Sequence, residues 1–404
     1  MTAKCRVLFF GEAVTLAHVA RPHCLARALD KQVFEVHFAC DKRFGFLRDD
    51  EQIRYWDIRS KTVEKFLNAV ETGKALYNKH ELIDYTNEDC ELIRKVQPDL
   101  VVGDFRHSLS ISTRLAQTPY VALINTYWSP YNADRALPVP EVRGVNLNGI
   151  PFMSRLMPTL SKAIFAFQGR ALNGARRHFG LEPFATCRDG WTFGDHVVYY
   201  DAYDLIPLDR LPRNHHYIGP VSWSPSIALP EWWDALDADR KTAYVSLGSS
   251  GNVGLVDAII DALLAEGVQV LLSSGGRFGH DPRDNVFVAA YLPGEAAARR
   301  ADLVICNGGS PTAYQSLSQA APVIGIPSNM DQLLAMRYIE RFGAGVTLRA
   351  AQIRAGLLST TVRRMLGDDG YRNRALKLSR LFAQTDPYQE FSALLRRLTG
   401  LAHA

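Results

Sequence analysis

The sequence contains no long hydrophobic run and no closely spaced pair of cysteines. Its six cysteines are scattered without a Cys-x-x-Cys pair, which predicts free thiols in a reducing compartment. No apolar run approaches the roughly 18 residues that a membrane span needs. The first apolar run, Val7 to Phe10, is too short for a signal peptide. We therefore expect a cytoplasmic protein. The cysteines are Cys5, Cys24, Cys40, Cys90, Cys187 and Cys306.

A strong net charge and a metal-binding cluster are also missing. Forty-six basic residues against 42 acidic ones give a net charge of +4, which suits an anionic ligand but is too weak to predict nucleic-acid binding. The nearest approach to a metal-binding run is Asp201-Ala202-Tyr203-Asp204, which lies away from the glycine-rich motifs, so we expect no metal site. The length of 404 residues suits two domains.

Short apolar segments alternate with helical segments in both halves of the chain. Cys5–Phe10, Phe34–Cys40 and Leu100–Val102 are typical of buried strands, and the repeated β-α pattern predicts an α/β fold with parallel, doubly wound sheets. A proline-rich stretch from Ile218 to Lys241 predicts a linker, and a second β-α series follows it. We expect an N-terminal domain over 1–218, a linker over 219–241, a second domain over 242–384, and a C-terminal helix within 385–404. Ligands of two such sheets would bind in a cleft at the carboxyl ends of the strands.

The region 153–179 mixes basic and apolar residues in a helical pattern. A peripheral membrane contact is one interpretation, and a packed helix with a solvated basic face is the other. The pattern favours the packed helix. The basic residues are Arg155, Lys162, Arg170, Arg176 and Arg177.

The most informative stretch runs from Ala301 to Leu348. It contains a strand (Leu303–Cys306), a small-residue turn (Gly308–Thr312) that opens a helix, a second strand, and Asp331-Gln332 at the next helix start. A glycine turn at a helix start presents free N–H groups and a positive dipole end, which suit a diphosphate. Asp-Gln can bind hydroxyl groups, so the combination predicts a nucleotide-sugar site. The turn Ser246–Gly251 adds small residues and hydroxyl donors at a similar strand end.

His18 is a candidate general base, and Asp104 is its candidate orienting acid. Histidine suits the removal of a hydroxyl proton, and a carboxylate at the end of strand Leu100–Val102 could fix its tautomer. The residues alone leave two alternatives open: His18 could be structural at a helix start, and Asp104 could cap the following helix.

Three aromatic residues within a turn, Tyr127, Trp128 and Tyr131, could line a pocket for a flat or lipidic acceptor, or could be core packing. Arg106 and His107 follow Asp104 directly and could meet a polar or anionic group of an acceptor.

Residues 301–348 resemble the donor-site signature of nucleotide-sugar glycosyltransferases with a GT-B fold. Weaker similarity covers 5–29 and 97–131. Asn307 stands where the family has histidine, and Gln315 where it has glutamate; both keep hydrogen-bonding capacity and lose charge. The matching positions are the Gly308-Gly309 turn, Ser310, Thr312, Pro322, Pro327, Asp331 and Gln332.

The resemblance implies two Rossmann-like domains facing across a cleft, with the C-terminal helix packed back on the first domain. It implies inverting, metal-independent hexosyl transfer from a UDP- or dTDP-sugar to a hydroxyl of a small-molecule acceptor, with His18 as base, Asp104 as its partner, and no cofactor beyond the nucleotide-sugar co-substrate. Two alternatives remain: a sugar-nucleotide epimerase on the same fold, and a non-catalytic partner of another glycosyltransferase. The donor residues implied are Ser249, Ser250, Leu292, Asn307, Gly309, Ser310, Thr312, Gln315, Asp331 and Gln332.

Overall fold

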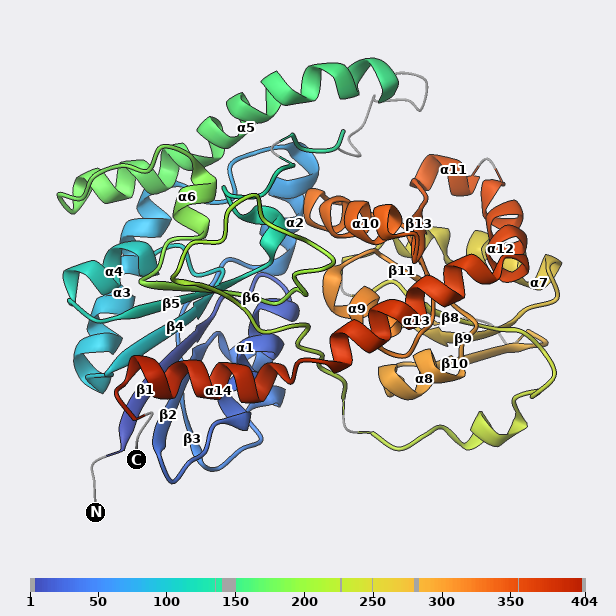
Figure 1. The fold of residues 1–404 in the computed structure, drawn as a ribbon, viewed down its shortest axis with the longest axis horizontal. Coiled ribbons are helices and arrows are strands. Elements are labelled where there is room, and N and C mark those ends of the chain that lie inside the picture. The colour runs from blue at the N-terminus through green and yellow to red at the C-terminus, as the bar shows by residue number, and fades with distance from the viewer. Residues whose placement is uncertain are drawn as a thin grey trace. The chain divides into compact units, whose positions relative to one another are not determined.

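The computed structural model describes residues 4–134, 136–139, 150–225, 227–248, 250–279, 283–354 and 356–401. The chain divides into two compact units (Figure 1). Unit 1 comprises Met1–Ala136, Leu156–Val221 and Thr385–Ala404; unit 2 comprises Leu137–Arg155 and Ser222–Gln384. The described residues 137–139 and 150–155, which were expected in the first domain, group with unit 2.

Unit 1 is built on a seven-stranded parallel sheet in the order β3-β2-β1-β4-β5-β6-β7. The central strand β1 is almost wholly apolar, and Val7, Leu8, Phe9 and Phe10 have no exposed surface, as expected of a strand covered on both faces. The strands are β1 (Cys5–Gly11), β2 (Phe34–Cys40), β3 (Ile53–Asp57), β4 (Leu100–Asp104), β5 (Tyr120–Ile124), β6 (His196–Tyr199) and β7 (His215–Tyr217).

The helices of unit 1 include two that are distant in sequence and adjacent in space. The C-terminal helix α14 packs beside α1, where the rings of Phe391 and Phe9 lie 6.1 Å apart and Arg396 pairs with Asp30 at 3.2 Å. No helix of the described ranges is both long and apolar enough to cross a bilayer. The helices are α1 (Ala17–Ala28), α2 (Val63–Thr72), α3 (Lys79–Val96), α4 (Leu109–Leu115), α5 (Ile150–His178, most of it in unit 1), α6 (Cys187–Trp191) and α14 (Pro387–Leu398).

Unit 2 is built on a six-stranded parallel sheet in the order β10-β9-β8-β11-β12-β13. Its strands are β8 (Thr242–Ser246), β9 (Gln269–Ser273), β10 (Val286–Ala289), β11 (Leu303–Cys306), β12 (Val323–Gly325) and β13 (Gly345–Thr347). Its helices are α7 (Val256–Ala265), α8 (Gly294–Arg300), α9 (Ser310–Ser318), α10 (Met330–Phe342), α11 (Ala350–Arg354), α12 (Leu357–Gly367) and α13 (Asp369–Ala383). Two parallel, helix-covered sheets confirm the predicted fold class.

Candidate active site

The start of α1 lies beside the end of β4 because of how β1 and β4 pair. The two strands are parallel neighbours, with Gly11 in register with Asp104. A Cβ atom at Gly11 would lie 3.0 Å from the carbonyl oxygen of His18, so glycine allows the first turn of α1 to approach the strand closely. His18 therefore faces Asp104 across the carboxyl edge of the sheet.

His18 and Asp104 form a close pair. Nδ1 of His18 lies 2.7 Å from Oδ1 of Asp104; the histidine side chain is 20% exposed and the carboxylate only 2%. A carboxylate can only accept a hydrogen bond, so Nδ1–H donates and the lone pair of a neutral ring lies on Nε2. Nε2 has no hydrogen-bond partner within the described ranges. The pair can therefore take a proton from a group placed at Nε2.

The other oxygen of Asp104 is held by two side chains that the sequence analysis did not identify. The Tyr200 hydroxyl donates to Oδ2 at 2.9 Å, and Nη2 of Arg21 lies 3.6 Å from the same oxygen. Burial and the neighbouring Asp104 charge raise the pKa of Tyr200 well above its usual value, so the phenol stays protonated and donates. These contacts offset the cost of burying the carboxylate and fix its orientation.

Arg21 is itself anchored to the turn that carries the predicted aromatic wall. Its Nη1 donates to Oδ1 of Asn125 at 2.8 Å, and its guanidinium lies 4.1 Å from the ring centroid of Tyr200. Asp201, considered above as part of a metal-binding run, is fully buried and accepts from Asn125 Nδ2 at 3.0 Å and from the Thr126 amide at 2.5 Å. In the structure Asp201 thus orders the turn.

A continuous series of rings leads away from His18. The imidazole of His18 stacks on the ring of Phe105, with the ring centroids 4.5 Å apart. The centroid distances of the next pairs are 4.6 Å from Phe105 to His107, 5.8 Å from His107 to Trp191, and 5.1 Å from Trp191 to Trp128. Phe105 has φ of 58°, in the left-handed region that an aromatic residue rarely adopts, directly after Asp104. We call Phe105, His107, Trp191 and Trp128 the ring series.

Only one of the three predicted wall residues belongs to the ring series. Trp128 does, whereas Tyr127 is a core residue with 2% exposure and Tyr131 packs against His215 at 5.3 Å. No periodic pattern marks Phe105 or Trp191, because Phe105 directly follows the end of β4 and Trp191 ends a five-residue helix.

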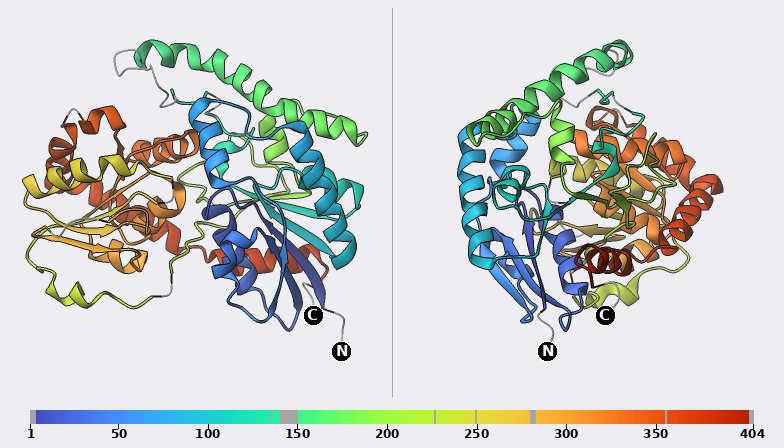
Figure 2. Two further views of the ribbon diagram at one scale, coloured as in Figure 1. Left: turned by 180° about the vertical axis from the view of Figure 1, so that it is seen from behind. Right: turned by 60° about the vertical axis from the view of Figure 1, so that its left-hand side comes forward.

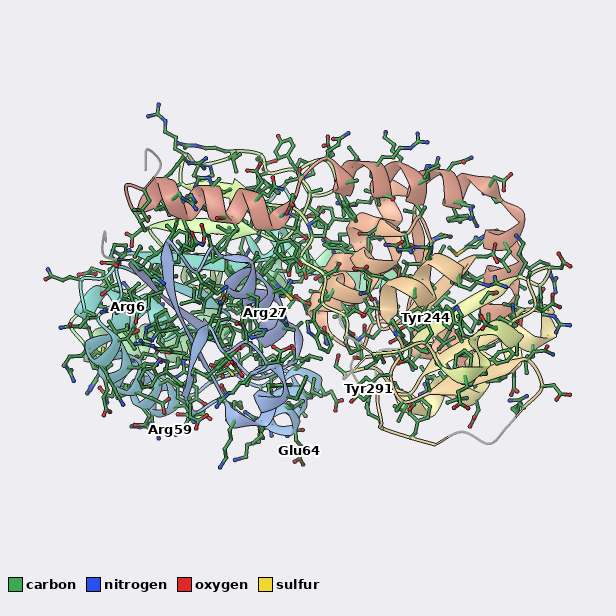
Figure 3. All side chains as sticks on the ribbon, turned by 90° about the horizontal axis from the view of Figure 1, so that it is seen from below. Arg6, Arg27, Arg59, Glu64, Tyr244 and Tyr291 are labelled. Carbon is green, nitrogen blue, oxygen red and sulfur yellow. The ribbon has the colours of Figure 1, made fainter. Side chains whose placement is uncertain are left out.

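The structure contradicts the expectation that Arg106 contacts an acceptor. Its side chain has no exposed surface and pairs with Glu12, Asp89 and Glu88 at 2.8, 2.8 and 3.1 Å. It also donates to the backbone carbonyl of Arg59, a residue labelled in Figure 3, at 2.6 Å. These contacts, with Nε–H donating to Asp89, occupy all the N–H directions of the guanidinium. Arg106 therefore holds the interior of unit 1 together.

His107 is also interior. Burial, followed by the nearby His18, lowers the pKa of His107 to about 3, so the ring is neutral at ordinary pH and cannot act as a cation toward an anionic group. Its Nε2 and the Tyr77 hydroxyl are buried with no hydrogen-bond partner in the described part of the chain. Both residues line a small cavity with Leu172 and Trp191.

In unit 2, three of the predicted donor residues, Ser250, Asn307 and Gln332, meet beyond the carboxyl ends of the adjacent strands β8, β11 and β12. Ser250 Oγ accepts from Asn307 Nδ2 at 3.1 Å and from Gln332 Nε2 at 2.9 Å, and its carbonyl accepts from Ser328 Oγ at 3.0 Å. Ser249 lies outside the described residues. These hydrogen bonds connect the three turns to one another.

The turn after β11 opens α9 as the sequence predicted. Asn307 Oδ1 accepts from the Gly309 amide at 3.1 Å, and Gly309 is the N-cap of α9, followed by Ser310, Pro311 and Thr312. Gly308 has φ of 76°, and a Cβ atom there would lie 2.7 Å from Cγ of Met336, so this position accepts glycine alone without strain. The first turn of α9 offers a positive dipole end to an anion.

The remaining donor residues occupy different surroundings. Gln315 is buried and donates to the Trp223 carbonyl at 3.3 Å, in space left by Gly294, where a Cβ atom would lie 2.1 Å from Gln315 Oε1. Leu292 is buried, next to Tyr291, which is exposed and labelled in Figure 3. Asp331 is half-buried in the first turn of α10. Gln332 uses its side-chain oxygen to accept from the Ser328 amide at 2.8 Å.

Arg277 is a basic residue at these turns that the sequence analysis missed. It follows β9, and its guanidinium donates to the carbonyls of Gly248 and Gly251 at 2.7 and 3.0 Å. It brings a positive charge to the turn after β8, at a site where Asn307 is neutral. In the sequence, the signal that could have identified Arg277 is its position after β9, the strand next to β8.

Comparison with known proteins adds three findings. Residues 279–395 match the family model described as "Erythromycin biosynthesis protein CIII-like, C-terminal domain". The chain is 43% identical over 381 residues, 93% of this chain and 88% of the relative, to a PGL/p-HBAD biosynthesis glycosyltransferase of Mycobacterium tuberculosis (strain ATCC 25177 / H37Ra). It is 42% identical over 382 residues, 94% of this chain and 84% of the relative, to a PGL/p-HBAD biosynthesis rhamnosyltransferase of Mycobacterium bovis (strain BCG / Pasteur 1173P2).

Among solved structures, the chain is similar to the spinosyn rhamnosyltransferase SpnG complexed with thymidine diphosphate. The TM-score is 0.70 with 19% identity, over 97% of this chain and 99% of that chain. At this identity the likeness concerns the fold alone.

Proposed function

We infer the reaction of this chain from the family to which it belongs, the GT-B glycosyltransferases of the macrolide glycosyltransferase-like family, which includes the mycobacterial PGL/p-HBAD glycosyltransferases. We propose that it transfers a hexose from a UDP- or dTDP-sugar to a hydroxyl of a small-molecule acceptor that is aromatic or lipidic, with inversion at the anomeric carbon. A deoxyhexose such as rhamnose and a dTDP donor are supported by the names of the similar proteins.

The observation that carries the proposal is the 2.7 Å contact between His18 Nδ1 and Asp104. In the proposed step, Nε2 takes the acceptor hydroxyl proton while the oxygen attacks the anomeric carbon and the bond to the diphosphate breaks. Asp104 stabilises the imidazolium that forms, and Tyr200 and Arg21 keep Asp104 in place. An epimerase on this fold would instead need acidic residues near C2 of the sugar, and it would need no aromatic wall for an acceptor.

The diphosphate leaving group is assigned to unit 2. Its developing charge meets the N-terminal N–H groups of α9 and the side chains of Ser250 and Asn307. Asn307 replaces a titratable histidine with a neutral amide, and Arg277 supplies a positive charge to the adjoining turn. We therefore propose that nucleotide affinity depends little on pH between 6 and 8.

The sugar hydroxyls are assigned chiefly to Asp331. Gln332, proposed with it from the sequence, already bonds Ser250 and Ser328, so its role is to order the donor turns and to exchange these bonds when the donor arrives. The acceptor is assigned to the ring series that begins at Phe105, because flat apolar surface beside the base suits an aromatic or lipidic group.

The experiment that tests the proposal is transfer from dTDP- and UDP-sugars to a panel of phenolic and lipidic alcohols. The product should carry the inverted anomeric configuration by NMR coupling constants. A product of retained configuration would overturn direct displacement by a His18-activated acceptor. If calorimetry shows no nucleotide-sugar binding across the donor panel, the chain is a non-catalytic member of the family and the proposal fails.

A further inference from the structure

Helix α5 carries two apolar faces, of which the fold uses one. Met157, Phe165 and Leu172 are buried; Leu172 belongs to a core cluster with Tyr77 and Leu82, and the Phe165 ring centroid lies 5.4 Å from the Arg188 guanidinium. Figures 1 and 2 show the helix (green) on the outside of unit 1, with the strands farther inside. The second apolar face is exposed and points away from the first.

The second face is a continuous stripe. Phe152, Leu156, Leu160 and Phe167 are 65, 42, 38 and 40% exposed, and their spacing of four, four and seven residues places them on one side of a helix. Ala163, also exposed, fills the gap between Leu160 and Phe167. We call these five residues the α5 stripe. Exposed apolar patches of this kind mark interaction sites in proteins.

The charges beside the α5 stripe are all of one sign. Arg155, Lys162, Arg170 and Arg177 are exposed along the same helix, and residues 150–178 contain no aspartate or glutamate. Within the described ranges none of these four cations has a carboxylate at ion-pair distance; Arg170 lies 5.9 Å from the Phe167 ring centroid. An apolar stripe flanked by unpaired cations has the chemistry of a helix that lies in the interface of an anionic lipid bilayer.

We propose that α5 docks this protein on the surface of an anionic membrane, with the α5 stripe among the acyl chains and the four cations at the lipid phosphates. A second copy of the chain does not fit as the occupant, because a two-fold contact through this face would bring like charges together. The sequence pattern had favoured a packed helix with a solvated basic face; the exposed apolar residues beside the cations are what the sequence could not show.

The test is co-sedimentation of the full chain with vesicles of equimolar phosphatidylcholine and phosphatidylglycerol, and with vesicles of phosphatidylcholine alone. We expect binding to the anionic vesicles that weakens as NaCl is raised. The variant K162Q/R170Q should lower the partition coefficient about 30-fold, from about 1 kcal/mol per cation. The variant L160S/F167S should lower it by about tenfold or more.

Matched controls come from exposed residues of unit 2. R364Q/K377Q removes two exposed cations and L357S/L376S two exposed leucines from α12 and α13, and neither should change binding. Circular dichroism checks that all variants are folded. Equal binding to both vesicle types, no binding at all, or α5 variants that behave like the controls would overturn the proposal. Self-association that the α5 variants abolish would assign the stripe to a second copy instead. No outcome depends on the proposed transfer reaction, because no catalysis is measured.

Discussion

Replacing Arg106 by leucine distinguishes between two roles of this residue: stabilising the interior of unit 1 and contacting the acceptor. Arg106 neutralises Glu12 and Asp89, which are 1 and 0% exposed. Leucine would leave both carboxylates buried without their cation. Removing one partner of a buried ion pair costs about 3–5 kcal/mol of unfolding free energy. We expect a loss of this size in Arg106→Leu at pH 7.5.

The loss should shrink as the pH falls. Burial raises the pKa of Glu12 and of Asp89, and Arg106 opposes that rise. Without Arg106 the two pKa values rise further, so the folded variant binds protons that the unfolded chain does not. The stability that these two protonated carboxylates contribute to the variant is therefore present at low pH and is lost as the pH rises, by up to about 1.4 kcal/mol per pH unit for each carboxylate.

Urea unfolding followed by circular dichroism at pH 5.5 and 7.5 measures both effects. The control is Arg27→Leu, which removes an exposed pair with Asp49 (2.9 Å; 49 and 53% exposed) and should cost less than about 1 kcal/mol. If Arg106→Leu unfolds at the wild-type urea concentration and instead raises KM for the acceptor, the interior role is wrong and the acceptor contact is right.

Three further predictions concern single side chains. Tyr200→Phe removes a donor to Asp104, a bond to a charged group worth about 1.5–3 kcal/mol, so kcat should fall roughly tenfold or more with nucleotide affinity unchanged; an unaltered kcat would contradict the positioning role. The pKa of His107 is lowered to about 3, so the stability that its neutral ring contributes is present above pH 6.5 and is lost as the pH falls toward 3. When the pH is lowered from 6.5 to 5, the unfolding free energy of His107→Phe, measured with urea, should fall by about 2 kcal/mol less than that of the wild type. Equal losses would refute this prediction. Gly308→Ala should lower the melting temperature and abolish the rise in melting temperature that dTDP produces. The control is Gly356→Ala: Gly356 has φ of 77° and no atom lies within 4 Å of the new Cβ, so this variant should show only the left-handed strain of about 1–2 kcal/mol and keep the dTDP shift. Similar behaviour of the two variants would contradict a role of Gly308 in the donor turn.

The fold and the histidine–aspartate contact followed from local sequence. Apolar strands broken by glycine and proline predicted parallel sheets, and parallel sheets bring strand ends to one edge. Asp104 at the end of β4 and His18 after β1 were therefore expected at the same edge, and their side chains lie 2.7 Å apart. The turn that opens α9 could be predicted from the sequence for the same reason.

The surroundings of that contact did not follow from local sequence. Arg106 is two residues from Asp104, and Phe105, with φ of 58°, stands between them where the chain leaves β4. The guanidinium then meets Glu12, 94 residues away, and Asp89, 17 residues away. Pairings over such separations depend on tertiary packing, which no motif encodes. Tyr200 was hidden in the same way, 96 residues from Asp104.

The transfer rate of His18→Ala tests directly whether His18 is the general base. With dTDP- or UDP-sugar and an accepted alcohol, we expect kcat to fall by about 100- to 10,000-fold, the usual contribution of a general base. Calorimetric affinity for the nucleoside diphosphate should stay at the wild-type value, because the residues proposed to bind the nucleotide belong to unit 2 and His18 belongs to unit 1. Full transfer activity in His18→Ala would contradict the account.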